Sequence, residues 1–199
     1  MAGAFPISTA KIDSLGIKSI QNTIISKSVS GKKLARQIDG QRWAFTARII
    51  TAKRSDVYGE LMAFIVKQRS GKENFTIIPP EVEDARGTAS GTPNGTASAG
   101  ATSITLGGSG TGTLKAGDFI KFANHDKVYM VVADQSDIST GSLTIEPPLT
   151  TAVSSSDIIY DNVPFTVHLN NDIQEFGVVG ADKDGNALYQ FEFDVEESL

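Results

Sequence analysis

Strict alternation of apolar and polar residues is the feature that most restricts the fold of this 199-residue chain. The alternation is uninterrupted along 188–196, and the same period of two recurs along 41–51 and 164–169. Successive side chains of a strand point to opposite faces of a sheet, so this pattern predicts strands with one buried and one exposed face. In the second segment the predicted core face carries Trp43, Phe45, Ala47 and Ile49.

Two further segments have local signals of their own. Val57, Leu61, Phe64 and Ile65 lie on one stripe at helical spacing, which predicts a single amphipathic helix over about 55–69. Ser55 is expected as its N-cap, because serine side chains accept hydrogen bonds from the first free N–H groups of a helix. Nearer the N-terminus, β-branched residues predict a strand over about 19–28, followed by a turn at 30–33.

Composition divides the chain into two parts. Residues 86–113 are almost all Gly, Ala, Ser and Thr, and short strand patterns at roughly ten-residue spacing follow them. We therefore expect 84–162 to form a small all-β domain, with a Gly/Ser/Thr-rich entry, inserted into a domain built from 1–83 and 163–199. The predicted fold class is mainly β. It combines a split antiparallel β-barrel or sandwich, one packed α-helix and the small inserted all-β domain.

Composition also excludes several classes of protein. The chain has no cysteine, so it has no disulfide scaffold, cysteine nucleophile or thiolate metal site. No apolar run approaches the roughly 18–20 residues of a membrane-spanning helix, so no membrane span is expected. The first residues lack the charged and apolar regions of a secretory signal, and we expect none there.

No arrangement of residues typical of an active site is found in the sequence. The two histidines, His125 and His168, lack metal-ligand spacing, and the turn 182–185 lacks the third acid and closing glutamate of a calcium loop. The Gly-rich tract contains neither a phosphate-binding loop nor a nucleophile elbow. We therefore expect a protein that is not an enzyme and that has no catalytic, metal-binding or cofactor-binding residues and no cofactor.

Charge is distributed unevenly along the chain. Residues 1–80 carry 13 Lys/Arg against 5 Asp/Glu, and residues 81–199 carry 5 against 18, for a total of −5. A basic cluster surrounds Trp43 and Phe45, but both aromatic residues share the predicted core face and so are not expected to stack on bases. Opposite charges suit contacts between copies of one protein. The candidate subunit-interface or channel-facing residues are Lys32, Lys33, Arg36, Arg42, Arg48, Glu192, Asp194 and Glu196.

The chain resembles the tail structural proteins of tailed bacteriophages. The resemblance rests on SVSGKKLARQIDGQRWAFTARI (28–49), on SDVYGELMAFIVKQRSGKENFTIIPP (55–80), and on TLKAGDFIKFANHDKVYMVVAD (113–134) followed by SLTIEPPL (142–149). It is greatest with the distal-tail and tail-tip group, whose members share the split β-barrel and helix of tail-tube proteins.

This resemblance implies a homo-oligomeric ring, commonly hexameric, around the DNA channel in the tail tip or baseplate. The neighbours would be tail-tube and tail-tip or hub proteins, and DNA would be only passing cargo. It implies a virion protein made in the host bacterial cytoplasm, and an insertion that projects outward and could meet a host surface glycan.

Two alternative functions stay open at this point. A carbohydrate-binding module is favoured by the β insertion with an exposed Tyr129 or Tyr160. A nucleic-acid-binding protein is favoured by the basic N-terminal part, and its binding would weaken steeply with salt.

Overall fold

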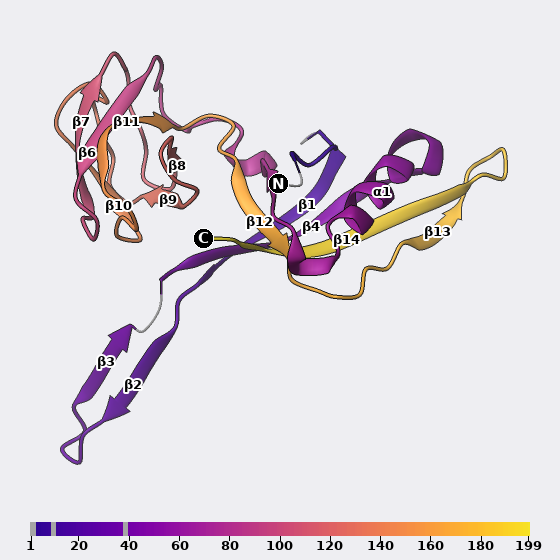
Figure 1. Ribbon diagram of the computed structural model, residues 1–199, viewed down its shortest axis with the longest axis horizontal. Coiled ribbons are helices and arrows are strands. Elements are labelled where there is room, and N and C mark those ends of the chain that lie inside the picture. The colour runs from indigo at the N-terminus through magenta and orange to yellow at the C-terminus, as the bar shows by residue number, and fades with distance from the viewer. Residues whose placement is uncertain (1–2, 9–10, 38–39) are drawn as a thin grey trace.

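The computed structural model describes residues 3–8, 11–37 and 40–199 (Figure 1). A main sheet of six antiparallel strands is built from both ends of the chain. Its strands, in spatial order, are β1 (Ile12–Ile20), β4 (Arg42–Lys53), β14 (Ala187–Glu197), β12 (Phe165–Leu169) and β5 (Phe75–Ile77), with β13 (Gly177–Ala181) also paired to β14. The two long strands β4 and β14 lie at its centre, so the segments with the clearest alternation form the middle of the sheet.

The predicted core face of β4 is buried. Trp43, Phe45, Ala47 and Ile49 are at most 6% exposed. In the register of the sheet, Phe45 lies opposite Ile17 on one side and Val195 on the other. Apolar residues from three strands therefore form one continuous surface, which is the core of this part of the molecule.

The helix α1 (Gly59–Lys67) supplies the other side of this core. Its buried residues Leu61 and Ile65 join the same apolar cluster as the sheet. The hydroxyl of Tyr58 donates to the carbonyl of Ile50 at 2.9 Å and accepts from the N–H of Phe191 at 3.0 Å. One buried side chain thus ties the start of the helix to both central strands. Two short 3₁₀ turns, η3 (Ser70–Lys72) and η4 (Pro80–Val82), follow α1.

The predicted cap of this helix is wrong. The helical backbone begins with a π-helical turn, η2 (Arg54–Tyr58), whose N-cap is Lys53, and Ser55 lies inside that turn. The Ser55 hydroxyl donates to the Asp56 carboxylate at 2.9 Å instead of accepting from a backbone N–H. The Tyr58 anchor also joins the helix to β14, more than 100 residues further along the chain, and local sequence cannot reveal that contact.

A closed antiparallel barrel lies in the middle of the chain. Its strands are β6 (Pro93–Ala97), β7 (Ser103–Gly108), β8 (Phe119–Phe122), β9 (Val128–Val131), β10 (Ser142–Glu146) and β11 (Val153–Ile159). The barrel has its own buried cluster, which includes Ile104, Ile120, Phe122 and Leu143. The predicted mainly β class, with a packed helix and a small all-β unit, is confirmed. The closed barrel is formed by the middle of the chain, and the main sheet is open across the described residues.

The Gly-rich entry forms a tightly packed ribbon beside this barrel. Ser90 and Thr111 exchange both backbone hydrogen bonds at 2.9 Å, and their hydroxyls also meet at 2.9 Å. At Gly112, where φ is +88°, an added Cβ atom would lie 2.1 Å from the carbonyl oxygen of Thr88. Glycine is therefore required here for close backbone approach as well as for its backbone angle.

We predict that Gly112→Ala destabilises the protein more than Gly100→Ala does. Gly100 also has a positive φ, of +83°, but a Cβ atom there would meet nothing within 4 Å. Gly100→Ala should therefore lower the free energy of unfolding by about 1 kcal/mol, the cost of a left-handed residue. Gly112→Ala should cost about 2 kcal/mol more because the backbone must move apart. Denaturant titration measures both, and equal losses would contradict the close-packing explanation.

Candidate functional site

A two-stranded hairpin projects from the main sheet (Figure 1). It consists of β2 (Thr23–Lys27) and β3 (Lys33–Gln37), which pair only with each other, and all ten of these residues are exposed. The predicted strand over 19–28 is thus two strands, because the chain leaves β4 after Ile20 and pairs with β3 from Thr23 onward. A two-stranded hairpin without further packing is marginally stable in water.

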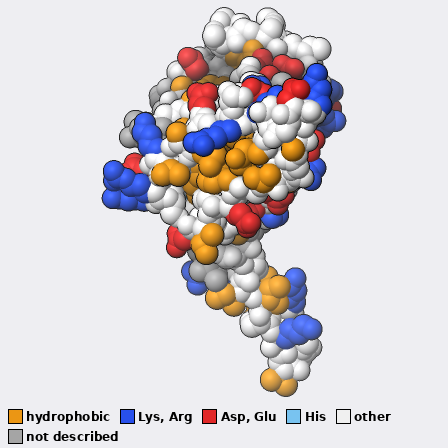
Figure 2. All heavy atoms as spheres, turned by 90° about the vertical axis from the view of Figure 1, so that its right-hand side faces the viewer, with side chains coloured by type: hydrophobic (Ala, Val, Ile, Leu, Met, Phe, Trp, Pro, Cys, Tyr) orange, Lys and Arg blue, Asp and Glu red, His pale blue; other side chains and the backbone are white. Residues whose placement is uncertain are grey.

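The hairpin is both basic and apolar. Residues 23–37 carry four Lys/Arg and no Asp/Glu, and they include the predicted interface residues Lys32, Lys33 and Arg36. No carboxylate pairs with these cations in the described parts of the chain. Exposed apolar side chains accompany them, namely Ile24, Ile25, Val29 and Leu34. Figure 2 shows these basic and apolar side chains along the projecting arm. Such a surface is suited to a partner that is apolar and acidic.

The other predicted interface residues lie together on the polar face of the main sheet. Arg42 forms a 2.7 Å salt bridge with Glu196, and Arg48 forms one of the same length with Asp13. Glu192 lies opposite Arg48 in the register of the strands. Asp194, the remaining member, accepts hydrogen bonds from the side chains of Thr46 and Asn171. The acidic strand β14 thus complements β4 within the chain, whereas the three hairpin residues lie apart from this face.

A buried charged cluster joins the barrel to the main sheet. Lys127 and Glu197 form an ion pair and are only 2% and 1% exposed. The Lys127 ammonium also donates to the Gln41 side chain at 2.8 Å. Glu197 accepts from the backbone N–H groups of Val128 at 2.8 Å and Trp43 at 3.1 Å. Burial lowers the pKa of Lys127, and the adjacent carboxylate opposes that shift.

The indole of Trp43 completes this junction. Its Nε1 donates to the carbonyl of Val128 at 2.9 Å, and its ring contacts Phe119 edge to face, with centroids 5.1 Å apart. Trp43 belongs to β4, whereas Val128 and Phe119 belong to the barrel strands β9 and β8. The junction is therefore held by hydrogen bonds and by an apolar contact.

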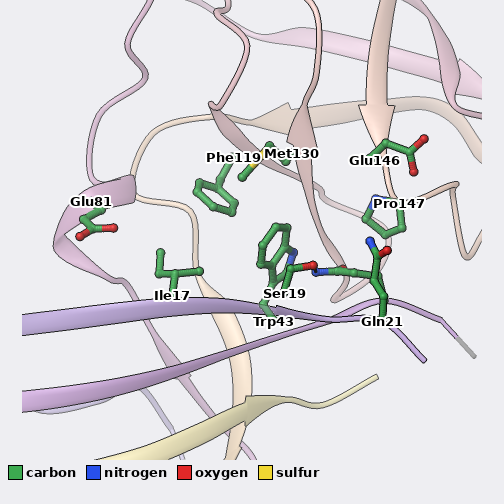
Figure 3. Close-up of a pocket in the computed structure, with 10 residues that line it drawn as sticks. Ile17, Ser19, Gln21, Trp43, Glu81, Phe119, Met130, Glu146 and Pro147 are labelled. Carbon is green, nitrogen blue, oxygen red and sulfur yellow. Dashed lines mark hydrogen bonds between the residues drawn. The ribbon is translucent and has the colours of Figure 1, made fainter. Parts of the chain in front are cut away.

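A cleft of about 520 Å³ opens beside this junction, between β1 and β4 on one side and the barrel on the other (Figure 3). Its apolar lining includes Ile17, Trp43, Phe119 and Met130. Two exposed carboxylates, Glu81 and Glu146, lie at opposite ends of it in Figure 3. The sequence interpretation placed Trp43 in the core and did not identify this cleft. No local pattern in the sequence predicts that β1 faces barrel residues more than 100 positions away along the chain.

The residues considered as possible metal ligands have structural roles in the fold. The two ring nitrogens of His125 lie 2.8 Å from Oδ1 of Asn124 and 2.7 Å from the hydroxyl of Tyr129, and burial lowers the pKa of His125. Asp182 accepts from the backbone N–H groups of Asp184 and Asn186, which makes 182–186 the turn between β13 and β14. Among the described residues, no group of three His, Asp or Glu side chains is placed to hold a metal ion.

The exposed tyrosines expected on the insertion are not found. Tyr129 is completely buried and Tyr160 is 8% exposed. The hydroxyl of Tyr160 donates to the carbonyl of Gly91 at 3.0 Å, so this ring is held against the Gly-rich ribbon. Both aromatic rings pack in the buried cluster of the barrel, because a small closed barrel must fill its interior with its own large side chains. None of the described helices is long and apolar enough to cross a membrane.

Comparison with known proteins shows a similarity in the barrel region. Residues 83–163 match the family model described as "Distal tail protein pb9, B domain", and this range contains all six barrel strands. The match fits a structural protein of the distal tail of a tailed bacteriophage, and it confirms the resemblance found in the sequence. The family suggests a non-enzymatic role in the virion tail, in association with other tail proteins. No curated protein is similar enough to the chain to be matched.

We predict that Lys127→Met destabilises the protein by about 3–5 kcal/mol, because it leaves Glu197 as an unpaired buried charge. Adding Glu197→Gln should recover part of this loss, so the double variant should be more stable than the sum of the two single losses implies. The matched control is Lys115→Met, which removes an exposed pair with Asp134 and should leave stability almost unchanged. Additive losses in denaturant titrations would contradict the coupling.

Proposed function

We propose that this protein forms a ring in the tail tip or baseplate of a tailed phage, where it joins the tail tube to the distal tip around the DNA channel. The projecting hairpin is the observation that carries the proposal. It has exposed apolar side chains and four cations that no carboxylate in the described residues neutralises. A hairpin of this kind gains stability only from another molecule. The family match supports a tail structural protein as the setting.

A ring requires that two different surfaces of each copy meet, and the chain offers such surfaces. A closed ring is built from head-to-tail contacts, in which one patch of a subunit binds a different patch of the next. The hairpin is one such patch. The edge strand β1 is another, because its nine residues pair only with β4 among the described strands. We propose a ring of six copies, the order that the resemblance implies.

In the proposed function the barrel binds no glycan and the hairpin binds no nucleic acid. Tyr129 and Tyr160 are packed inside the barrel, so neither offers a platform for a sugar. Trp43 and Phe45 are buried as well, and residues 23–37 include no aromatic side chain that bases could stack on. Passing DNA is the only nucleic acid that this function involves.

The proposal also includes the division of the chain into two domains, one built from residues 1–83 with 163–199 and the other from residues 84–162.

We expect the triple variant Lys32→Glu, Lys33→Glu, Arg36→Glu to stay folded but to lose ring formation. The three side chains are exposed, so the thermal transition of the monomer should not change. Reversed charge should prevent contact with an acidic surface of the next copy. Light scattering measures the mass in solution, and electron microscopy measures incorporation into particles.

The matched control is Lys67→Glu, Arg69→Glu, Lys72→Glu, which makes the same charge change on exposed residues at the end of α1. This control should assemble normally. Rings of normal mass from the hairpin variant would refute a role for its cations. A wild-type protein that stays monomeric at all concentrations and is absent from particles would refute the ring itself.

A further inference from the structure

We infer that the cleft between the main sheet and the barrel is the docking site for the β2–β3 hairpin of a neighbouring copy of this chain. The inference rests on the proposed ring and deepens it, because it names the two surfaces that meet. Its evidence is the match between two features at separate places in the fold, the projecting hairpin and the cleft of Figure 3.

The aliphatic side chains of the hairpin are not buried by the described residues. Ile24, Ile25 and Leu34 are each more than half exposed, although aliphatic residues of this size gain free energy from burial. Lys27 and Lys33 lie directly opposite each other across the two strands, and like charges in that position destabilise a hairpin. An occupant that offers apolar surface and carboxylates relieves both costs.

The cleft offers those two groups. Its floor is apolar, and Phe119 and Met130 of the barrel are only partly buried there. The two charged residues of its lining are Glu81 and Glu146, and neither pairs with a cation in the described residues. No Lys or Arg lines it. A basic hairpin with aliphatic side chains is therefore complementary to the cleft in charge and in polarity.

The hairpin that fills the cleft belongs to another copy. Gln21 lines the cleft and is the first residue of the short connection between β1 and β2, so the cleft lies at the root of the chain's own hairpin. From this root the hairpin runs away from the body of the molecule, and its tip lies far from the barrel in Figure 1. Each copy thus presents one hairpin and one cleft. Head-to-tail repetition of this contact builds a ring when the rotation between successive copies closes.

Engineered cysteines test the contact directly, because the chain has none of its own. Leu34→Cys places a thiol on the hairpin, and Glu146→Cys places one at the cleft. The two single variants, one of them with an affinity tag, are mixed at a concentration where wild type assembles, and are oxidised mildly. We expect a mixed disulfide dimer in at least several-fold excess over either homodimer, and mass spectrometry of its peptides should identify the 34–146 bond.

The matched control replaces Glu146→Cys with Ile173→Cys. Ile173 is 87% exposed and lies outside the cleft, so its thiol is at least as accessible. This mixture should give only the random proportion of mixed dimer. The same proportion from Glu146→Cys would overturn the inference.

Charge exchange provides a second, independent test. Glu81→Lys with Glu146→Lys should weaken self-association at least tenfold, because the cleft would then repel the hairpin. Adding Lys27→Glu and Lys33→Glu to the same chain should restore most of the lost affinity. Sedimentation equilibrium measures each association constant, and unchanged thermal transitions show that the variants are folded.

The outcomes separate this inference from the ring proposal. Normal rings from the cleft variant, with no enrichment of the 34–146 disulfide, would overturn the docking site and leave the ring intact. Loss of association without rescue by charge exchange would mean that the cleft binds something other than the hairpin, which also overturns the inference. A wild type that never associates would refute both proposals.

Discussion

The buried contact between Lys127 and Glu197 is the constraint on which the arrangement of this molecule depends. Both charges are almost completely removed from water, a costly arrangement that is favourable only when every polar atom is satisfied. The hydrogen bonds to Gln41, Val128 and Trp43 meet that condition. Because these partners come from the barrel and from the main sheet, the pair links the two units directly beside the cleft.

The molecule therefore combines a well-packed body with a hairpin that no other described strand supports. The body has two apolar clusters, one under the main sheet and one inside the barrel. Among the described strands, the two strands of the hairpin pair only with each other, at five residue pairs. Stability is not uniform across proteins, and segments that bind other molecules are often drawn from the less stable end. A free copy is thus expected to be folded but incomplete.

Much of the body could be predicted because its signals are local. The alternation along 41–51 identified the buried face of β4, and the stripe that includes Leu61 and Ile65 identified the helix. Predictions failed where the folded structure departed from the local pattern. The helical backbone begins at Arg54 with Lys53 as its N-cap, so Ser55 does not cap the helix, and Tyr129 is buried because a small barrel needs its ring as core.

The sequence by itself determined the fold class, with β strands from their period and one helix from its stripe, and it carried the resemblance to phage tail proteins that the family match supports. It also located the basic residues that became the hairpin. Only the tertiary structure decided that Arg42 and Glu196 pair within the chain, whereas Lys32, Lys33 and Arg36 find no carboxylate among the described residues. Pairing between β4 and β14 joins segments about 150 positions apart, and no local pattern encodes a contact of that range.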